Sequence, residues 1–212
     1  MKDILIIGGG GHAKSVIDSI LADHTYRVIG YTANEKNDAL PFPYLGSDDA
    51  LEDCFKQGIT NAVMGIGFLG GNSHIRDRLF AKAKAIGYCF PTIVDPTAII
   101  AQNAIIGEGS YIGKKVVVNA DAVVGEECII NTGAIVEHDC TVGKESHIAV
   151  GAVLCGGASV GDRCLIGANA TLIQGVSVGN NAIVGAGSVV LDNVPDSKTV
   201  GGVPIKIIHS KE

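Results

Sequence analysis

The sequence predicts a small α/β domain followed by an all-β parallel β-helix made of six-residue repeats. Two patterns support this prediction. The first ninety residues alternate apolar runs with a glycine loop and helical stretches, and aliphatic residues then recur at every sixth position. The composition agrees, because 29 glycines, 5 Phe, 5 Tyr and no Trp leave a core of small aliphatic side chains. We expect three parts: residues 1–90, residues 91–195 and a tail, residues 196–212.

The six-residue period runs from Val94 to Val190 without insertion or deletion. All seventeen positions are aliphatic, and the residue two places before each one is small or β-branched. A short fixed period indicates stacked units that cannot bury an apolar face alone. Three hexads would form one triangular coil, so residues eighteen apart would stack at about one strand spacing, roughly 4.8 Å. The seventeen hexads then give nearly six coils.

Glycine most often follows the inward aliphatic residue, and we expect it to permit the backbone conformation of a turn. These glycines are Gly107, Gly113, Gly125, Gly143, Gly161, Gly167, Gly179 and Gly185. Cys128, Cys140 and Cys164 fall on the small inward position. Because a buried free cysteine behaves as a small hydrophobe, we expect core thiols there and no disulfide.

Charge and cysteine spacing exclude several classes of function. A net charge of −6 argues against nucleic acid, which attracts a basic surface. The apolar runs are too short to span a bilayer, and the N-terminal run ends at Gly8, too early for a secretory signal. The six cysteines match no metal motif. We expect a cytoplasmic protein with free thiols, no bound metal and no membrane partner.

The first ninety residues predict a Rossmann-like α/β unit with a parallel sheet. We expect strands over residues 2–7, Tyr26–Tyr31 and about Asn61–Ile66, and helices through Leu21 and from about Ser73 to Ile86. The run G-G-G-G-H-A-K-S follows the first strand, where backbone amides at a helix N-terminus bind phosphate. Four glycines exceed what a tight turn needs, so we expect an anion to bind there. An NAD site is not expected, because the end of the second strand carries no carboxylate.

An acid–base cluster interrupts the monotonous repeat at V-E-H-D-C. His138 lies two residues after an inward position, which predicts an exposed ring near a corner of the prism. Glu137 and Asp139 flank it, so one carboxylate could orient the imidazole and stabilise its cation. A surface histidine on a solvated face is the simpler alternative.

Two further residues favour catalysis. Gly156 lies eighteen residues after His138 and should stack directly on it, which offers its amide as an oxyanion donor. A second histidine, His147, lies nine residues after His138, which is half a coil round the prism. A base beside a backbone donor suits direct attack by an amine or hydroxyl on a thioester. The competing nucleophile, Cys155, stacks on Glu137, and a nearby carboxylate disfavours the thiolate.

With these residues in view, the chain resembles the hexapeptide acyltransferases that include bacterial sialic acid O-acetyltransferases and UDP-4-amino-sugar N-acetyltransferases. The resemblance rests on G-G-G-G-H-A-K-S, I-N-T-G-A-I-V-E-H-D-C, H-I-A-V-G-A and G-G-V-P-I-K, which together span nearly the whole chain. It implies a left-handed β-helix, a homotrimer with active sites at subunit interfaces, acetyl-CoA as donor, and a sugar nucleotide held partly by the N-terminal domain.

The resemblance also implies roles for individual residues. His138 matches the general base, Asp139 the acid that orients it, and Gly156 the amide that contacts the thioester carbonyl. The residues that match the family's acceptor-binding site are Gly10, Gly11, His12, Asn131 and His147. The coenzyme A site matches Gly156 and the tail residues Gly201, Val203, Pro204 and Lys206.

We therefore expect an acetyl-CoA-dependent acetyltransferase that N-acetylates a UDP-4-amino-sugar of a bacterial surface glycan. Sugar-nucleotide members tend to carry acidic residues after the second strand, where this chain has Thr32, Ala33 and Asn34. O-acetylation of free or CMP-linked sialic acid therefore stays open. A zinc carbonic anhydrase-like trimer is a further alternative, although only His138 and His147 precede His209 within the repeats and tail. The last alternative is a structural trimer without catalytic activity.

Overall fold

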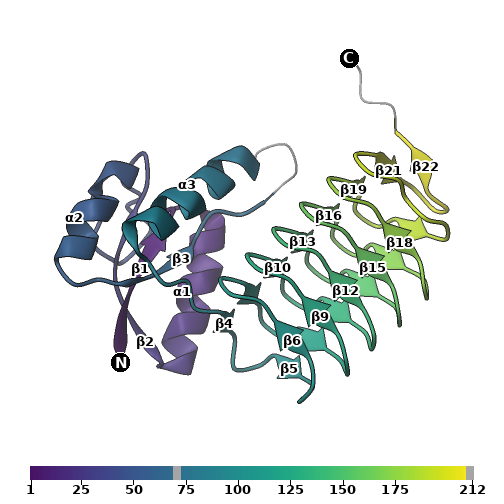
Figure 1. Cartoon of the computed structure of the whole chain (residues 1–212), viewed down its shortest axis with the longest axis horizontal. Helices are drawn as coiled ribbons and strands as arrows, with labels where there is room; N and C mark the ends of the chain where they lie inside the picture. Colours follow the sequence, from purple (N-terminus) through teal and green to yellow (C-terminus); the bar gives the residue numbers. More distant parts are fainter. Residues whose placement is uncertain (69–72, 209–212) are drawn as a thin grey trace. The chain divides into compact units, whose positions relative to one another are not determined.

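The computed structural model describes residues 1–68 and 73–208, so His209 lies outside the described residues. The chain divides into two compact units, Met1–Pro96 and Thr97–Glu212 (Figure 1). Within the described ranges, no helix is both long and apolar enough to cross a membrane.

The first unit is built on a three-stranded parallel sheet in the order β2-β1-β3. Its elements are β1 (Lys2–Ile7), α1 (Gly11–Asp23), β2 (Tyr26–Thr32), the 3-10 helix η1 (Asp48–Ala50), α2 (Leu51–Lys56), β3 (Asn61–Met64), α3 (Ser73–Ile86) and β4 (Ile93–Val94). Strand and helix positions agree with the sequence-based predictions to within two residues at each described end. The short helices η1 and α2 were not expected. Their Leu51 and Cys54 are buried in the same apolar cluster as Leu5 and Ile7 of β1.

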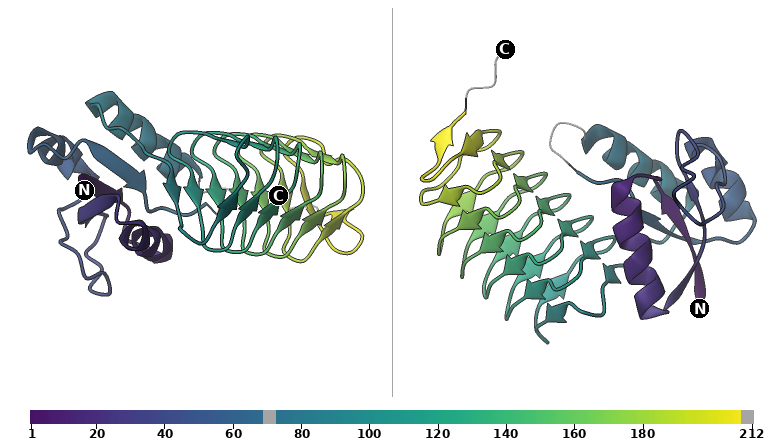
Figure 2. Two further views of the ribbon diagram at one scale, coloured as in Figure 1. Left: turned by 90° about the horizontal axis from the view of Figure 1, so that it is seen from below. Right: turned by 180° about the vertical axis from the view of Figure 1, so that it is seen from behind.

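The second unit is a triangular prism of two-residue strands joined by tight turns (Figure 2). One face carries β7, β10, β13, β16, β19 and β21, the second β5, β8, β11, β14, β17 and β20, and the third β6, β9, β12, β15 and β18. Neighbours from β5 to β20 are parallel with an eighteen-residue register, as in the pairs Ile135↔Val153 and Thr141↔Ser159. This is the stacking that the six-residue period predicts. The last parallel pair, β19 with β21, has a sixteen-residue register, as in Ile183↔Thr199.

The strands of the prism have the following bounds: β5 Ile99–Ile100, β6 Ile105–Ile106, β7 Tyr111–Ile112, β8 Val117–Val118, β9 Val123–Val124, β10 Ile129–Ile130, β11 Ile135–Val136, β12 Thr141–Val142, β13 His147–Ile148, β14 Val153–Leu154, β15 Ser159–Val160, β16 Leu165–Ile166, β17 Thr171–Leu172, β18 Ser177–Val178, β19 Ile183–Val184, β20 Val189–Val190, β21 Thr199–Gly201 and β22 Lys206–Ile207. The last strand, β22, pairs antiparallel with β21.

The interior of the prism is filled as the repeat predicts. Every sixth residue from Ile112 to Val190 is at most 3% exposed. Cys128, Cys140 and Cys164 are fully buried free thiols, also as predicted. Burial raises the pKa of the Cys140 and Cys164 thiols, so both stay protonated and inert.

The expected role of the repeated glycines was wrong. The left-handed backbone conformation occurs three residues after the inward aliphatic residue, as at Asp139 (φ 59°) and Gly157 (φ 69°), and not directly after it. The glycine directly after it is required by close stacking. A Cβ built on Gly143 would lie 2.5 Å from the Gly161 carbonyl carbon of the next coil. The next coil approaches equally closely at most of these glycines, where even alanine does not fit, but a Cβ on Gly185 would meet nothing closer than 3.4 Å.

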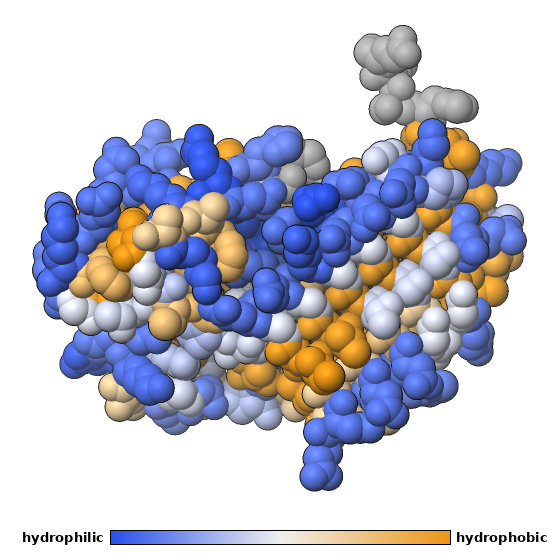
Figure 3. All heavy atoms as spheres, viewed as in Figure 1, coloured by the Kyte–Doolittle hydropathy of each residue, from blue (hydrophilic) through white to orange (hydrophobic). Residues whose placement is uncertain are grey.

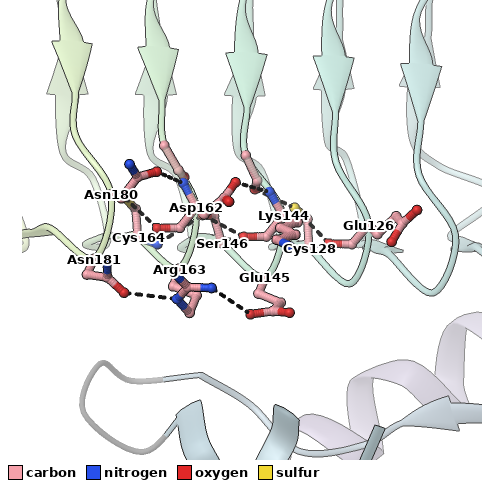
Figure 4. A network of polar contacts seen from close by, with 12 residues as sticks. Glu126, Cys128, Lys144, Glu145, Ser146, Asp162, Arg163, Cys164, Asn180 and Asn181 are labelled. Atoms are coloured by element: carbon pink, nitrogen blue, oxygen red, sulfur yellow. Dashed lines mark hydrogen bonds and ion pairs between the residues drawn. The ribbon is translucent and has the colours of Figure 1, made fainter. Parts of the chain in front are cut away.

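Side chains on the turns satisfy backbone amides that the short strands leave unpaired. Asp162 accepts from the amide of Lys144 (3.0 Å), and Asn180 accepts from the amide of Asp162 (2.8 Å), one coil further each time (Figure 4). Arg163 continues this ladder beside them, donating to Asn181 (2.9 Å). The turns therefore form a column of hydrogen bonds that links coil to coil.

Candidate active site

His138 stands on the turn that follows β11, and its side chain is exposed, as predicted. The ring atom Nδ1 lies 2.7 Å from Oδ2 of Asp139. Asp139 reaches back to the ring from the left-handed corner of the turn. An ionised carboxylate only accepts hydrogen bonds, so the proton resides on Nδ1 and the lone pair of Nε2 is left for another partner. Sequence reasoning therefore found both members of this pair.

The pKa of His138 is raised above its ordinary value. The hydrogen bond with Asp139 is the largest cause, and the negative charges of Asp139 and Glu137 add to it, while partial desolvation opposes them. A more basic imidazole is a better proton acceptor, provided that the pH keeps it neutral.

Glu137 does not contact the imidazole of His138 through a hydrogen bond. Its Oε2 atom accepts from the backbone amide of His138 (3.1 Å) and from Nδ2 of Asn119 in the coil before (3.0 Å). Glu137 therefore holds the turn on which His138 stands, and Asn119 holds Glu137. Sequence reasoning missed Asn119, although its eighteen-residue spacing from Glu137 was a usable signal.

Gly156 stacks directly on His138, as the register predicted. A Cβ built on Gly156 would lie 2.6 Å from both Cε1 and Nε2 of the ring. Glycine is therefore the residue that leaves room for an imidazole here. The amide of Gly156 makes no hydrogen bond with any described residue, whereas Asn131 caps the equivalent amide of Thr132 at 2.8 Å. An uncapped donor thus lies beside an imidazole with a free lone pair.

Asn131 and His147 form a second pair. Oδ1 of Asn131 caps Thr132, so Nδ2 is the atom directed at Nε2 of His147, 3.2 Å away. The amide of Asn131 then donates and Nε2 of His147 accepts. Asn131 follows β10 on one face, whereas His138 follows β11 on the next. Within the described part of one chain, no hydrogen bond joins the two pairs.

The glycine loop of the first unit divides into two halves. Gly8 has φ 110°, and a Cβ on Gly9 would lie 2.9 Å from the ring of Tyr31, so packing explains both. Gly10 and Gly11 face open space. Gly10 is the N-cap of α1 without a side-chain cap, Gly11 is its first residue, and His12 lies in its first turn. Uncapped amides at a helix N-terminus favour an anion.

The tail residues predicted for the coenzyme A site lie on the hairpin of β21 and β22. Gly201 pairs with Lys206 across the hairpin. Val203 and Pro204 are exposed in the turn between them, and the side chain of Lys206 is exposed too. The hairpin therefore presents an ammonium group and an apolar side chain to solvent.

Cys155 is a half-buried free thiol opposite Glu137 in the next coil. In the described ranges, no group of three or more His, Cys, Asp or Glu side chains is placed to hold a metal ion.

The comparisons with known proteins bear on both units. The PglD N-terminal domain family matches residues 3–83, and the hexapeptide repeat of succinyl-transferase matches residues 157–192. A mutant of GDP-perosamine N-acetyl transferase from Caulobacter crescentus, solved with CoA and GDP-perosamine, is 37% identical over 99% of this chain and 98% of its own (TM-score 0.93). The acetyltransferase domain of PglB from Neisseria gonorrhoeae FA1090 is 32% identical over 98% and 100% (TM-score 0.91). No curated sequence matches.

The prism, the family-model match and the solved structures place the protein among the hexapeptide-repeat acyltransferases and confirm the predicted left-handed β-helix. More narrowly, the chain belongs to the acetyl-CoA-dependent sugar N-acetyltransferases that join a PglD-type N-terminal domain to that prism. The expectations of an acyltransferase and of this family are thereby confirmed.

Proposed function

We propose that this enzyme transfers the acetyl group of acetyl-CoA to the amino group of an amino sugar linked to a nucleoside diphosphate, with His138 as general base. The observation that carries the proposal is the juxtaposition at His138: Nδ1 is bound to Asp139, and Nε2 lies against Gly156, whose amide is uncapped. The relatives solved with CoA and a sugar nucleotide support the choice of substrates.

The proposed reaction is direct transfer. The amine lone pair attacks the thioester carbonyl carbon while Nε2 of His138 takes a proton from the nitrogen. The amide of Gly156 stabilises the oxyanion of the tetrahedral intermediate. The carbon–sulfur bond then breaks, and the imidazolium of His138 returns the proton to the thiolate of coenzyme A. Asp139 keeps Nδ1 protonated throughout, so that Nε2 is always the atom that accepts and donates.

Each substrate has a proposed place. The phosphates of the nucleotide bind at Gly10, Gly11 and His12, where α1 begins without a side-chain cap. Asn131 and His147 contact the sugar. The hairpin residues Gly201, Val203, Pro204 and Lys206 bind coenzyme A, with the exposed Lys206 ammonium against a phosphate.

We further propose a homotrimer with active sites at subunit interfaces. His138 follows β11 on one face of the prism, whereas Asn131 follows β10 and His147 lies on β13 of another face, so residues of two chains would complete a site. Hydrophobic side chains also stay exposed on the prism (Figure 3), and Ile99 and Ile105 are 67% and 62% exposed. We place the enzyme in the cytoplasm, the reducing compartment that suits its free thiols.

The test is thiol release from acetyl-CoA, with a nucleotide-linked amino sugar and with sialic acid, by wild type and His138→Ala. We expect turnover with the amino sugar that falls at least about a hundredfold in the variant, the lower bound for a lost general base. Turnover with sialic acid alone would make the enzyme an O-acetyltransferase. Unchanged transfer by His138→Ala would overturn the role of the base.

A further inference from the structure

A polar cavity of about 390 Å³ lies beside the C-terminal end of β2 in the first unit. Its walls are Asn34, Ser47, Asp48, Asp49, Arg78, Leu79 and Lys82. The volume is within the usual range for small-molecule sites, and the lining is dominated by polar groups that select by hydrogen bonding. None of these residues has a part in the chemistry at His138.

The backbone explains how Asp48 reaches this place. The segment 43–46 runs alongside the end of β2, where Tyr31 donates to the carbonyl of Pro43 (3.0 Å) and Leu45 donates to the carbonyl of Tyr31 (2.9 Å). Ala33 then donates to the carbonyl of Gly46 (3.1 Å), just beyond the strand. The chain turns there into η1, so its first residue, Asp48, stands at the strand end.

Two hydrogen bonds connect Asp48 to the glycine loop. The hydroxyl of Thr32, the last residue of β2, donates to Oδ1 of Asp48 (3.4 Å). The backbone carbonyl of Thr32 accepts from the amide of Gly8 (2.8 Å), at the start of the loop. Thr32 is fully buried, so it fixes one oxygen of the carboxylate in place. The cavity and the proposed phosphate site are thus neighbours on one edge of the sheet.

The other oxygen of Asp48 is available to a ligand. Lys82 of α3 donates to the backbone carbonyl of Asp48 (2.9 Å) and to the side chain of Asp49 (3.1 Å), and not to the Asp48 carboxylate. Oδ2 of Asp48 accepts no hydrogen bond from any described residue. A half-buried carboxylate with one oxygen held and one free is suited to accept from hydroxyl groups.

We infer that Asp48 accepts hydrogen bonds from the ribose hydroxyls of the nucleotide that carries the acceptor sugar, so that the carrier is a ribonucleotide and not a 2′-deoxyribonucleotide. In nucleotide-binding α/β folds a carboxylate at the end of the second strand reads the ribose. Here that residue comes from η1, sixteen residues after Thr32. The inference rests on the proposed function only in assuming that the acceptor is bound to a nucleotide.

The test is calorimetric titration of the full-length protein with GDP, UDP and their 2′-deoxy counterparts, without acetyl-CoA. For whichever base binds, we expect the ribonucleotide to bind at least about tenfold more tightly, because a hydrogen bond to a charged group contributes roughly that factor. In Asp48→Ala the ratio should fall to near one. Asp53→Ala is the matched control, because Asp53 is an exposed carboxylate of α2 outside the cavity.

The outcomes separate this inference from the proposed function. Equal binding of the ribo and deoxy forms, or an unchanged ratio in Asp48→Ala, overturns the role of Asp48 even if acetyl transfer proceeds. Ribose discrimination that depends on Asp48, together with no acetyl transfer to any amino sugar, keeps this inference and overturns the proposed reaction. Binding of no nucleotide overturns this inference and the nucleotide-linked acceptor together. Melting curves of both variants check that they are folded.

Discussion

At the scale of single residues, the basicity of His138 depends on Asp139. The hydrogen bond raises the pKa of His138, and the imidazole acts as a base only when neutral, so activity falls as the pH decreases through that pKa. Asp139→Asn lowers this pKa. We expect the acidic limb of the pH profile of kcat/KM to move to lower pH and the plateau to drop about tenfold.

Asp121→Asn is the matched control for this change. Asp121 occupies the same left-handed corner one coil earlier (φ 58°), but it accepts from Asn103 (2.6 Å) instead of a histidine. Its replacement should leave the pH profile where it was. An acidic limb that stays in place in Asp139→Asn, or moves to higher pH, would contradict the role of the pair.

The side chain of Cys155 does not accept a hydrogen bond from the backbone amide of the next residue, Gly156. Asn119, Asn131 and Glu137 occupy the equivalent place in other turns, and each caps the amide of the next residue. Cysteine leaves the amide of Gly156 uncapped. We expect Cys155→Asn to cap it and lower kcat roughly a hundredfold, the cost of a lost oxyanion donor.

Cys155→Ala is the informative partner of this variant in the same thiol-release assay. It removes the thiol but adds no cap, so it should keep most of the activity. A complete loss in Cys155→Ala would favour an acyl-enzyme on the thiol, and equal activity of the two variants would contradict the role of the amide.

Sequence reasoning at the residue scale succeeded where contacts follow the repeat. His138, Asp139 and Gly156 were predicted to come together because their spacing is one residue or one coil. Asn119 obeys the same spacing but drew no attention, since a lone Asn is common on turns. The position of Asp48 beside the end of β2 could not be predicted from the sequence, because it depends on the path that segment 43–46 takes along β2.

At the scale of elements, each two-residue strand from β5 to β20 has one inward residue of the six-residue repeat and one outward residue. On β12, Val142 is 3% exposed and Thr141 is exposed. Val142→Asp buries an unpaired charge and should lower the free energy of unfolding by several kcal/mol. Thr141→Asp, its neighbour on the same strand, should melt within a few degrees of wild type. Thermal denaturation followed by circular dichroism measures both, and a wild-type melting curve for Val142→Asp would refute the register.

The sequence predicted elements best where a pattern repeats. Seventeen hexads in phase were enough to predict the register of the prism. The role of the repeated glycines was not predicted, because their close contact with the next coil is visible only when two coils are placed together. The helix α2 was missed although it has recognisable signals. Ser47 caps η1, the turn that leads into α2, and Asp48 and Asp49 are the first residues of η1. Gly58 follows the C-terminal end of α2. Its six residues are too few for a clear apolar period.

At the scale of the whole molecule, the proposed trimer makes a prediction about mixed assemblies. If His138 of one chain works with Asn131 of another, His138→Ala and Asn131→Ala chains should each be inactive alone. When the two chains are co-expressed in equal amounts and assemble at random, about a quarter of the sites should regain activity. Such a site needs wild-type His138 from one chain and wild-type Asn131 from its neighbour, and each chain supplies its residue with a probability of about one half.

Assay of the co-purified mixture measures this recovery, and sedimentation should give three times the 21.8 kDa chain mass. The matched control mixes His138→Ala with Asp139→Asn chains. Those two residues lie in one chain's turn, so the mixture should show no more than the activity of its separate parts. The same result for the Asn131→Ala mixture would place the whole site within one chain.

The stacking of the coils also sets the order in which the prism opens. A column whose members contact only their neighbours frays from its ends. The inward Ile100 and Ile106 at its start are only half-buried, whereas the equivalent residues around His138 and Gly156 are sealed on both sides. Amide hydrogens near the two ends should exchange first, and those of the central coils last. The base and its partner amide are thus kept in register until the final stage of unfolding, so catalytic competence should outlast the first loss of structure on heating.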